Sequence, residues 1–123
     1  MSVIVRDDGF HPDDWQGEVL DLAPDACLST LEGRIGGQKL VRIDFPSFAD
    51  GRGFTIARRV RSIGYLGRLR ARGHVLADQY AMARRVGFDE VEISDELAAR
   101  QPEDQWLARA DWKSNDYRAR LRG

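Results

Sequence analysis

The stretch "LVRIDF" at residues 40–45 alternates between apolar and charged side chains. Side chains of a β-strand point alternately to its two faces, so Val41, Ile43 and Phe45 share one face while Arg42 and Asp44 take the other. Parallel strands that are covered by helices on both faces are apolar throughout. The stretch therefore predicts a strand with one apolar face under helices and one ionic face.

Two later segments, "LGRLRA" (66–71) and "DEVEIS" (89–94), show the same alternation. Their apolar positions are Leu69, Ala71, Val91 and Ile93, and the intervening charged positions are Arg68, Arg70, Glu90 and Glu92. We expect three similar strands, with the arginine strand between two strands that bear acidic residues.

Amphipathic helices are expected between these strands, within "FTIARRV" (54–60) and "YAMARRV" (80–86). In the first, Ile56, Val60 and Ile63 recur at helical spacing, and in the second an apolar stripe is expected along Val75, Gln79, Met82 and Val86. Gly64 and Gly87 stand where a left-handed residue ends a helix.

Right-handed crossovers between successive neighbouring strands place every connecting helix on the same side of the sheet. We therefore predict a small single α/β domain over residues 1–123, with a singly wound β-α-β-α-β parallel sheet and helices on one face. Residues 1–39 are expected to form an irregular or edge-strand region, 40–99 the core and 100–123 a helical tail. The segment "EGRIGGQ" (32–38) is expected to be a glycine-rich hairpin or loop.

The ionic face of this sheet has two interpretations. Its charged side chains form cross-strand ion pairs, or they make a polar floor that leads to the carboxyl ends of the strands, where open α/β sheets bind ligands. Such a sheet leaves this face free of its own connecting helices, and cover by the N-terminal region or by a second subunit in a homodimer is an equal alternative.

Composition narrows the class of protein. Apolar residues make up 42% and charged residues 32% of the chain, and no apolar stretch is long enough to cross a bilayer. The N-terminus lacks the pattern of a secretion signal, so a cytoplasmic location is expected. Cys27 is the single cysteine, which excludes an internal disulfide, and His11 and His74 lack metal-ligand spacing, so no bound metal is expected.

Charge is segregated along the chain. Residues 1–50 carry four basic and ten acidic side chains, residues 51–85 carry nine arginines against Asp78 alone, and residues 86–123 carry six basic and nine acidic side chains. The arginines of the middle block are interpreted either as partners of the acidic flanks in a solvated network or as a surface for an acidic partner or oxyanion.

The loop "DGRG" (Asp50, Gly51, Arg52 and Gly53) connects the first predicted strand to the first predicted helix. Free amides at a helix start, glycines that permit close approach and the Arg52 guanidinium make a plausible anion cradle, although turn chemistry also explains the acid and the glycines. Supporting groups are expected from Arg70 and Arg72 at the end of the next strand.

The second predicted helix carries further polar candidates. His74, Asp78 and Arg85 are expected on its polar face as solvated charge pairs, and Gln79 follows Asp78 directly. If the chain is a small α/β enzyme, Asp50, Asp78 or His74 would act as acid or base.

Two runs, "FPSFADGRGFTIARRVR" (45–61) and "GYLGRLRARGHVLADQYAMARRVGFDEVEI" (64–93), resemble the bacterial family called domain of unknown function 934. The resemblance covers roughly residues 40–94. Its matching elements are Asp50 to Gly53, Gly64 and Tyr65, Leu69 to Ala71, Asp78 and Gln79, and Gly87 to Asp89. The sequence departs from the family pattern at Arg68, His74 and Val86, where glutamate, aspartate and cysteine are usual.

Members of that family look like small cytoplasmic proteins encoded beside the sulfite reductase haemoprotein, and the family is labelled a probable oxidoreductase. This sequence has no thiol pair, iron–sulfur ligand set or dinucleotide fingerprint, so any cofactor would be borrowed. We expect a cofactor-free accessory protein of assimilatory sulfite reduction that binds sulfite reductase, an acidic redox protein or a sulfur oxyanion through arginines. One alternative is a small oxidoreductase or other enzyme of sulfur metabolism. A nucleic-acid-binding protein is the less favoured alternative, because the overall charge of the chain is −1.

Overall fold

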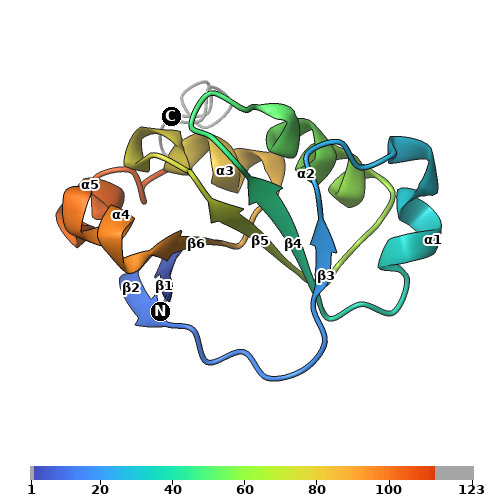
Figure 1. Cartoon of the computed structure of the whole chain (residues 1–123), viewed down its shortest axis with the longest axis horizontal. Helices are drawn as coiled ribbons and strands as arrows, with labels where there is room; N and C mark the ends of the chain where they lie inside the picture. The colour runs from blue at the N-terminus through green and yellow to red at the C-terminus, as the bar shows by residue number, and fades with distance from the viewer. Residues whose placement is uncertain (1, 113–123) are drawn as a thin grey trace, which may run out of the picture.

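The computed structural model describes residues 2–112 and contains a six-stranded sheet with helices packed on one side of its centre (Figure 1). Its strands are β1 Ser2–Arg6, β2 Gly9–Pro12, β3 Leu20–Leu22, β4 Leu40–Phe45, β5 Arg68–Gly73 and β6 Glu90–Ser94. Its helices are α1 Leu31–Ile35, α2 Arg52–Ser62, α3 Tyr80–Val86, α4 Asp95–Arg100 and α5 Glu103–Leu107, with 3-10 turns at Leu28–Thr30 and Ala77–Gln79.

The strand order is β2-β1-β6-β5-β4-β3, and β3, β4, β5 and β6 run parallel. The predicted parallel β-α-β-α-β unit is therefore confirmed as β4-α2-β5-α3-β6, with both connecting helices on the same face (Figure 1). The middle strand, β5, begins at Arg68, two residues later than predicted. Leu66 and Gly67 precede it, and the Leu66 side chain is 95% exposed, so it does not belong to the apolar face of the sheet.

The two connecting helices bury the faces that their spacing implies, with one correction. Ile56 and Val60 of α2 are buried, as expected. In α3 the buried side chains are Tyr80, Ala83 and Val86, whereas Met82, expected in the apolar stripe, is 52% exposed. The expected stripe is confirmed at Val75 and Val86, which are buried, and is wrong at Met82, because a 3-10 turn precedes α3 and the helical phase starts at Tyr80.

Gly64 and Gly87 end these helices with φ angles of 99° and 117°. This is the left-handed region that favours glycine, so both helix ends are confirmed.

The N-terminal region extends the sheet at both edges. The β1–β2 hairpin pairs antiparallel with β6, and β3 pairs parallel with β4. The expected glycine-rich loop at 32–38 is wrong over its first part: residues 31–35 form α1, whose Leu31 and Ile35 are buried. Two apolar residues four positions apart pack one helical face on the core, and this outweighs the helix-weakening effect of Gly33.

The short helix α4 closes the predicted core, and α5 is the part of the predicted helical tail that lies within the described residues. Trp106 of α5 is 1% exposed, and its ring meets the Tyr80 ring edge-on at 6.0 Å. The rest of the expected tail, residues 113–123, lies outside the described residues. Among residues 2–112, no helix combines the length and apolar character needed to cross a membrane.

Candidate functional site

The ionic face of the sheet is centred on Arg70, whose side chain is 1% exposed. Its Nε donates to Glu90 Oε2 at 2.6 Å and its Nη1 to Glu92 Oε1 at 2.8 Å. The two glutamates come from the neighbouring strand β6, because β5 and β6 pair with Arg70 opposite Glu90. Burial lowers the pKa of Arg70, but Glu90, Glu92 and Asp13 together outweigh burial and raise it, so the guanidinium stays charged.

Other arginines surround this buried centre. Arg42 pairs with two carboxylates: its Nε lies 2.6 Å from Asp21 Oδ1 and its Nη1 lies 3.1 Å from Glu92 Oε1. The pKa of Arg42 is raised chiefly by its hydrogen bond to Asp21. The remaining ion pairs of the face are Arg6–Glu90 at 3.2 Å, Arg68–Glu90 at 3.8 Å and Arg72–Glu92 at 3.4 Å. The cross-strand ion pairs expected from the sequence are therefore present, and each arginine of the face has a carboxylate partner.

The chain itself covers part of this face. Residues 13–19 connect β2 to β3 and run along the side of the sheet opposite α1, α2 and α3 (Figure 1). Asp13 Oδ1 lies 3.4 Å from Arg70 Nη1, and the Trp15 ring centroid lies 5.0 Å from Arg68 Cζ. Of the two covers that the sequence left open, the N-terminal region supplies this one. Arg70 Nη2 is buried without a hydrogen-bond partner in the described part of the chain.

The loop "DGRG" lies at the start of α2, at the carboxyl edge of the sheet, as the sequence indicates. Asp50 Oδ1 accepts hydrogen bonds from the backbone N of Arg52 at 3.1 Å and from its Nε at 3.0 Å, and Asp50 Oδ2 accepts from Nη2 at 2.7 Å. These hydrogen bonds from Arg52 lower the pKa of Asp50. The place where an external anion would bind Arg52 is thus taken by a carboxylate of the loop.

The glycines of this loop have different roles. A Cβ at Gly53 would overlap the Phe45 ring, whereas a Cβ at Gly51 would meet no atom within 4 Å. Gly53 is therefore required for close packing of α2 on β4.

The supporting residues expected at this loop are held elsewhere. Arg70 and Arg72 pair with β6 glutamates on the ionic face, so the expected convergence on Arg52 is not observed. Asp78 pairs with Arg109 at 2.9 Å, and both side chains are more than half exposed. Gln79 Oε1 accepts from the backbone N of Leu76 at 2.9 Å, and its Nε2 donates to Phe48 O at 3.4 Å. Gln79 thereby fixes the loop before α2.

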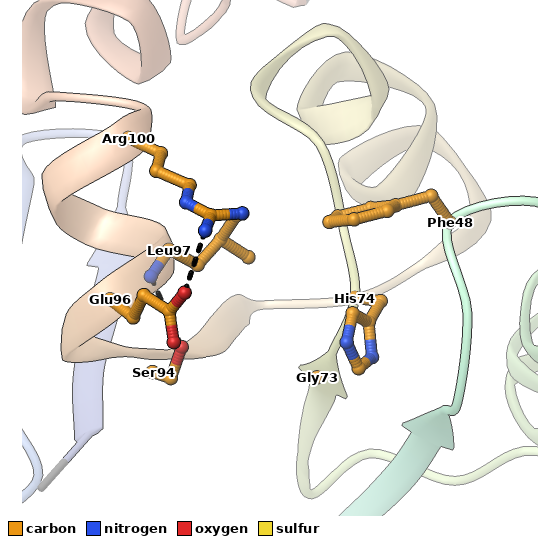
Figure 2. Close-up of a pocket in the computed structure, with 7 residues that line it drawn as sticks. All are labelled: Phe48, Gly73, His74, Ser94, Glu96, Leu97 and Arg100. Carbon is orange, nitrogen blue, oxygen red and sulfur yellow. Dashed lines mark hydrogen bonds and ion pairs between the residues drawn. The ribbon is translucent and has the colours of Figure 1, made fainter.

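A cavity of about 200 Å³ lies beyond the carboxyl ends of β5 and β6. Figure 2 shows Phe48 and His74 on one side of it and Glu96 and Arg100 of α4 on the other. Gly73, Ser94 and Leu97 complete the lining. In many open α/β sheets, ligands bind where neighbouring crossovers diverge to opposite faces, and a singly wound sheet has no such point. Here the opening lies between α4, which begins directly after β6, and the segments that follow β4 and β5.

His74 is held in one orientation at this cavity. Its backbone N donates to Phe45 O at 2.9 Å, and its Nδ1 lies 3.2 Å from the same oxygen. A carbonyl oxygen only accepts, so Nδ1 carries the proton and Nε2 is left as an acceptor in the neutral ring. Gly73 makes this turn possible with a φ of 113°, and a Cβ there would lie 2.6 Å from Phe45 O. The sequence predicted His74 on the polar face of the second helix. That prediction is wrong, because His74 precedes α3, which begins at Tyr80.

The remaining arginines of the block 51–85 divide into two groups. Arg61 pairs with Asp89 at 2.9 Å, and Arg84 pairs with Asp7 at 3.1 Å. Within residues 2–112, three arginines of the block have no carboxylate partner, and all three are exposed: Arg58, Arg59 and Arg85. We call these three the helical-face arginines. Arg85 Nη2 donates to the backbone oxygen of Trp112 at 3.4 Å.

The cavity was not predicted from the sequence, because its lining residues come from separate segments. Ser94 does cap α4, accepting from the backbone N of Leu97 at 3.1 Å. The usable signal was the position of His74 and Ser94 near the carboxyl ends of two predicted parallel strands, since such residues meet at one edge of the sheet. Among the described residues, no group of three or more His, Cys, Asp or Glu side chains could hold a metal ion.

Comparison with known protein families gives a match over most of the chain. The family model described as "Bacterial protein of unknown function (DUF934)" matches residues 19–121, so the chain belongs to this family. No curated protein and no solved structure matches the chain.

Proposed function

From membership of the DUF934 family, we propose that this protein is a cofactor-free accessory protein of assimilatory sulfite reduction in the bacterial cytoplasm. It docks on sulfite reductase or on an acidic redox protein through the helical-face arginines. The observation that carries the docking mode is the exposure of Arg58, Arg59 and Arg85 without a carboxylate partner within residues 2–112. The place in sulfite reduction rests on the family resemblance.

The position of these arginines suits an encounter surface. Arg58 and Arg59 project from the solvent side of α2, whose opposite side is buried through Ile56 and Val60. Arg85 is exposed on α3, which packs beside α2, and Met82 one turn earlier is 52% exposed. Unneutralised positive charge accelerates association with an acidic surface, and an exposed methionine adds an adaptable apolar contact.

Binding of a sulfur oxyanion at the "DGRG" loop is the alternative mode, and the geometry favours it less. Asp50 already accepts from three N–H groups of Arg52, so sulfite or sulfate would have to displace a covalently tethered carboxylate. An enzymatic role with a borrowed cofactor has no specific observation in its favour.

Docking is tested by measuring binding of the full chain to purified sulfite reductase and to an acidic redox protein. Measurements at about 0.01 M and 0.15 M salt change the Debye length from about 30 to about 8 Å. We expect binding at low salt that weakens at high salt, and a loss of about tenfold or more in affinity for Arg58→Glu/Arg59→Glu.

The matched control is Lys39→Glu/Arg109→Glu, which makes the same change in formal charge away from α2. Lys39 precedes β4 at the amino edge of the sheet, and Arg109 is already neutralised by Asp78. At about 0.15 M salt the control should keep its affinity within about twofold, because charges that lie more than a Debye length of about 8 Å from the docking surface are largely screened. Absence of a complex with either partner at low salt, or equal losses in the two double variants, would contradict the docking proposal.

A further inference from the structure

The cavity at the carboxyl edge has no part in the proposed docking, because the helical-face arginines lie on α2 and α3. It opens to solvent and is lined by the loop that bears Phe48, the turn at Gly73 and His74, the end of β6 at Ser94, and helix α4 (Figure 2). Its volume of about 200 Å³ is below the roughly 300–1,000 Å³ of pockets for drug-sized ligands, and it suits a molecule of amino-acid size.

The charged side of the cavity carries one acidic side chain, Glu96, and one basic side chain, Arg100. Arg100 Nη2 lies 2.8 Å from Glu96 Oε1, and both side chains are about three-quarters exposed. An exposed pair of this kind is worth little, so a ligand separates it at small cost. Arg100 makes no other hydrogen bond within residues 2–112, which leaves most of its fork available for a carboxylate.

The opposite side is aromatic and apolar. The Phe48 and His74 rings meet edge-on with centroids 5.1 Å apart, and Leu97 adds an aliphatic surface. In the neutral ring, Nε2 of His74 accepts hydrogen bonds, since Nδ1 donates to Phe45 O. An ammonium group therefore has two acceptors on the lining, Glu96 and His74, while an apolar side chain can contact Phe48 and Leu97.

We propose that this cavity binds a small zwitterion, a free α-amino acid with an apolar side chain. Arg100 takes the carboxylate, Glu96 and His74 take the ammonium, and Phe48 and Leu97 contact the side chain. A simple oxyanion such as sulfate suits the lining less, because the Glu96 carboxylate repels it and most of the volume stays unfilled. The inference stands independently of the docking function.

The test is a titration of the ¹⁵N-labelled full chain, followed by amide NMR shifts at Gly73, His74 and Leu97. The probes are L-leucine, isocaproate, which lacks the ammonium, and isoamylamine, which lacks the carboxylate. We expect saturable shifts with L-leucine and at least about tenfold weaker binding of the two analogues, because each loses one charge-assisted contact.

Variants assign the contacts to residues. Arg100→Gln and Glu96→Gln should each weaken L-leucine binding by about tenfold, whereas Arg109→Gln, which opens the exposed pair with Asp78, should leave it unchanged. The proposal is overturned if L-leucine gives no saturable shift at the cavity, if either analogue binds as tightly as L-leucine, or if Arg109→Gln weakens binding as much as Arg100→Gln.

Discussion

The two faces of the sheet use arginine in opposite ways. On the ionic face, Arg70 is buried and pairs with Glu90 and Glu92 across the strands. On the helical side, Arg58 and Arg59 stand in solvent with no carboxylate partner within residues 2–112. All of these arginines belong to one block of sequence, so composition does not distinguish a structural arginine from one that is available to a partner.

The difference follows from the period of each element. In β5 a period of two places alternate arginines beside the glutamates of β6, where the parallel pairing fixes their distance. In α2 a period of 3.6 turns the same side chain away from the sheet and from the acidic residues. We expect substitutions on the ionic face to affect stability and substitutions on the helical face to affect binding.

Replacement of Arg70 is expected to have the largest effect. Arg70→Met leaves Glu90 and Glu92 buried with only partly exposed arginines as partners, and it should lower the free energy of unfolding by about 3 kcal/mol. Arg58→Met, the matched change on the helical face, should alter it by less than about 0.5 kcal/mol. Urea denaturation measures both, and equal stability of the two variants would remove the distinction between the faces.

Removal of the cover over the ionic face should have the next largest effect. Trp15 stacks on Arg68 and donates from its Nε1 to Glu18 O at 3.3 Å. Trp15→Ala should lower the free energy of unfolding by about 1.5 kcal/mol through lost apolar burial and the lost cation–π contact. Trp15→Phe keeps a ring over Arg68 and should retain most of that stability. If chemical denaturation shows no loss for the alanine variant, residues 13–19 do not stabilise the face.

Arg84 is an intermediate case, a helical arginine that does have a carboxylate partner. Burial raises the pKa of Asp7, but hydrogen bonds from Tyr80 at 2.6 Å and from Arg84 outweigh burial and lower it. A carboxyl with a lowered pKa in the folded state stabilises the fold above its ordinary pKa of about 4, and this contribution is lost as pH falls through the folded value.

Asp7→Asn should therefore lower the free energy of unfolding by about 1 kcal/mol near pH 7, because a partly exposed ion pair is lost while an acceptor for Tyr80 remains. The difference from the unmodified protein should shrink towards zero as the pH falls through the lowered pKa of Asp7. Urea denaturation at a series of pH values measures this, and a difference that does not change with pH would rule out the charge of Asp7 as its cause.

The smallest effect on stability is expected at Arg58. Arg58→Glu places an acid three residues before Arg61 on α2, so stability should stay unchanged or rise by up to about 0.5 kcal/mol. Thermal unfolding checks this, and a clear loss of stability would mean that Arg58 has a structural role after all.

Much of the fold could be predicted because it follows from local patterns. The strand at 40–45 has the predicted bounds, and Gly64 and Gly87 end their helices as expected. The helix at residues 31–35 was missed because Gly33 and the following Gly36 and Gly37 resemble a loop, and only contact of Leu31 and Ile35 with the core makes it helical. Local propensity is a weak guide where two buried side chains decide the conformation.

The candidate site was less predictable. The loop at Asp50–Gly53 lies where the sequence placed it. The sequence did not predict that the Arg52 guanidinium donates to the Asp50 carboxylate, because this depends on the conformation of both side chains. The cavity depends on Phe48, His74 and Arg100, which come from three segments far apart in the sequence. No local pattern connects such residues.

The sequence by itself determined the parallel order of β4, β5 and β6 and the existence of one ionic and one apolar face, because both depend on side-chain periodicity and on the handedness of crossovers. Only the tertiary structure decided which arginines are neutralised, what covers Arg70, and that α4 faces His74 across a cavity. Those features depend on distances between segments that the chain brings together only when the whole sheet has formed.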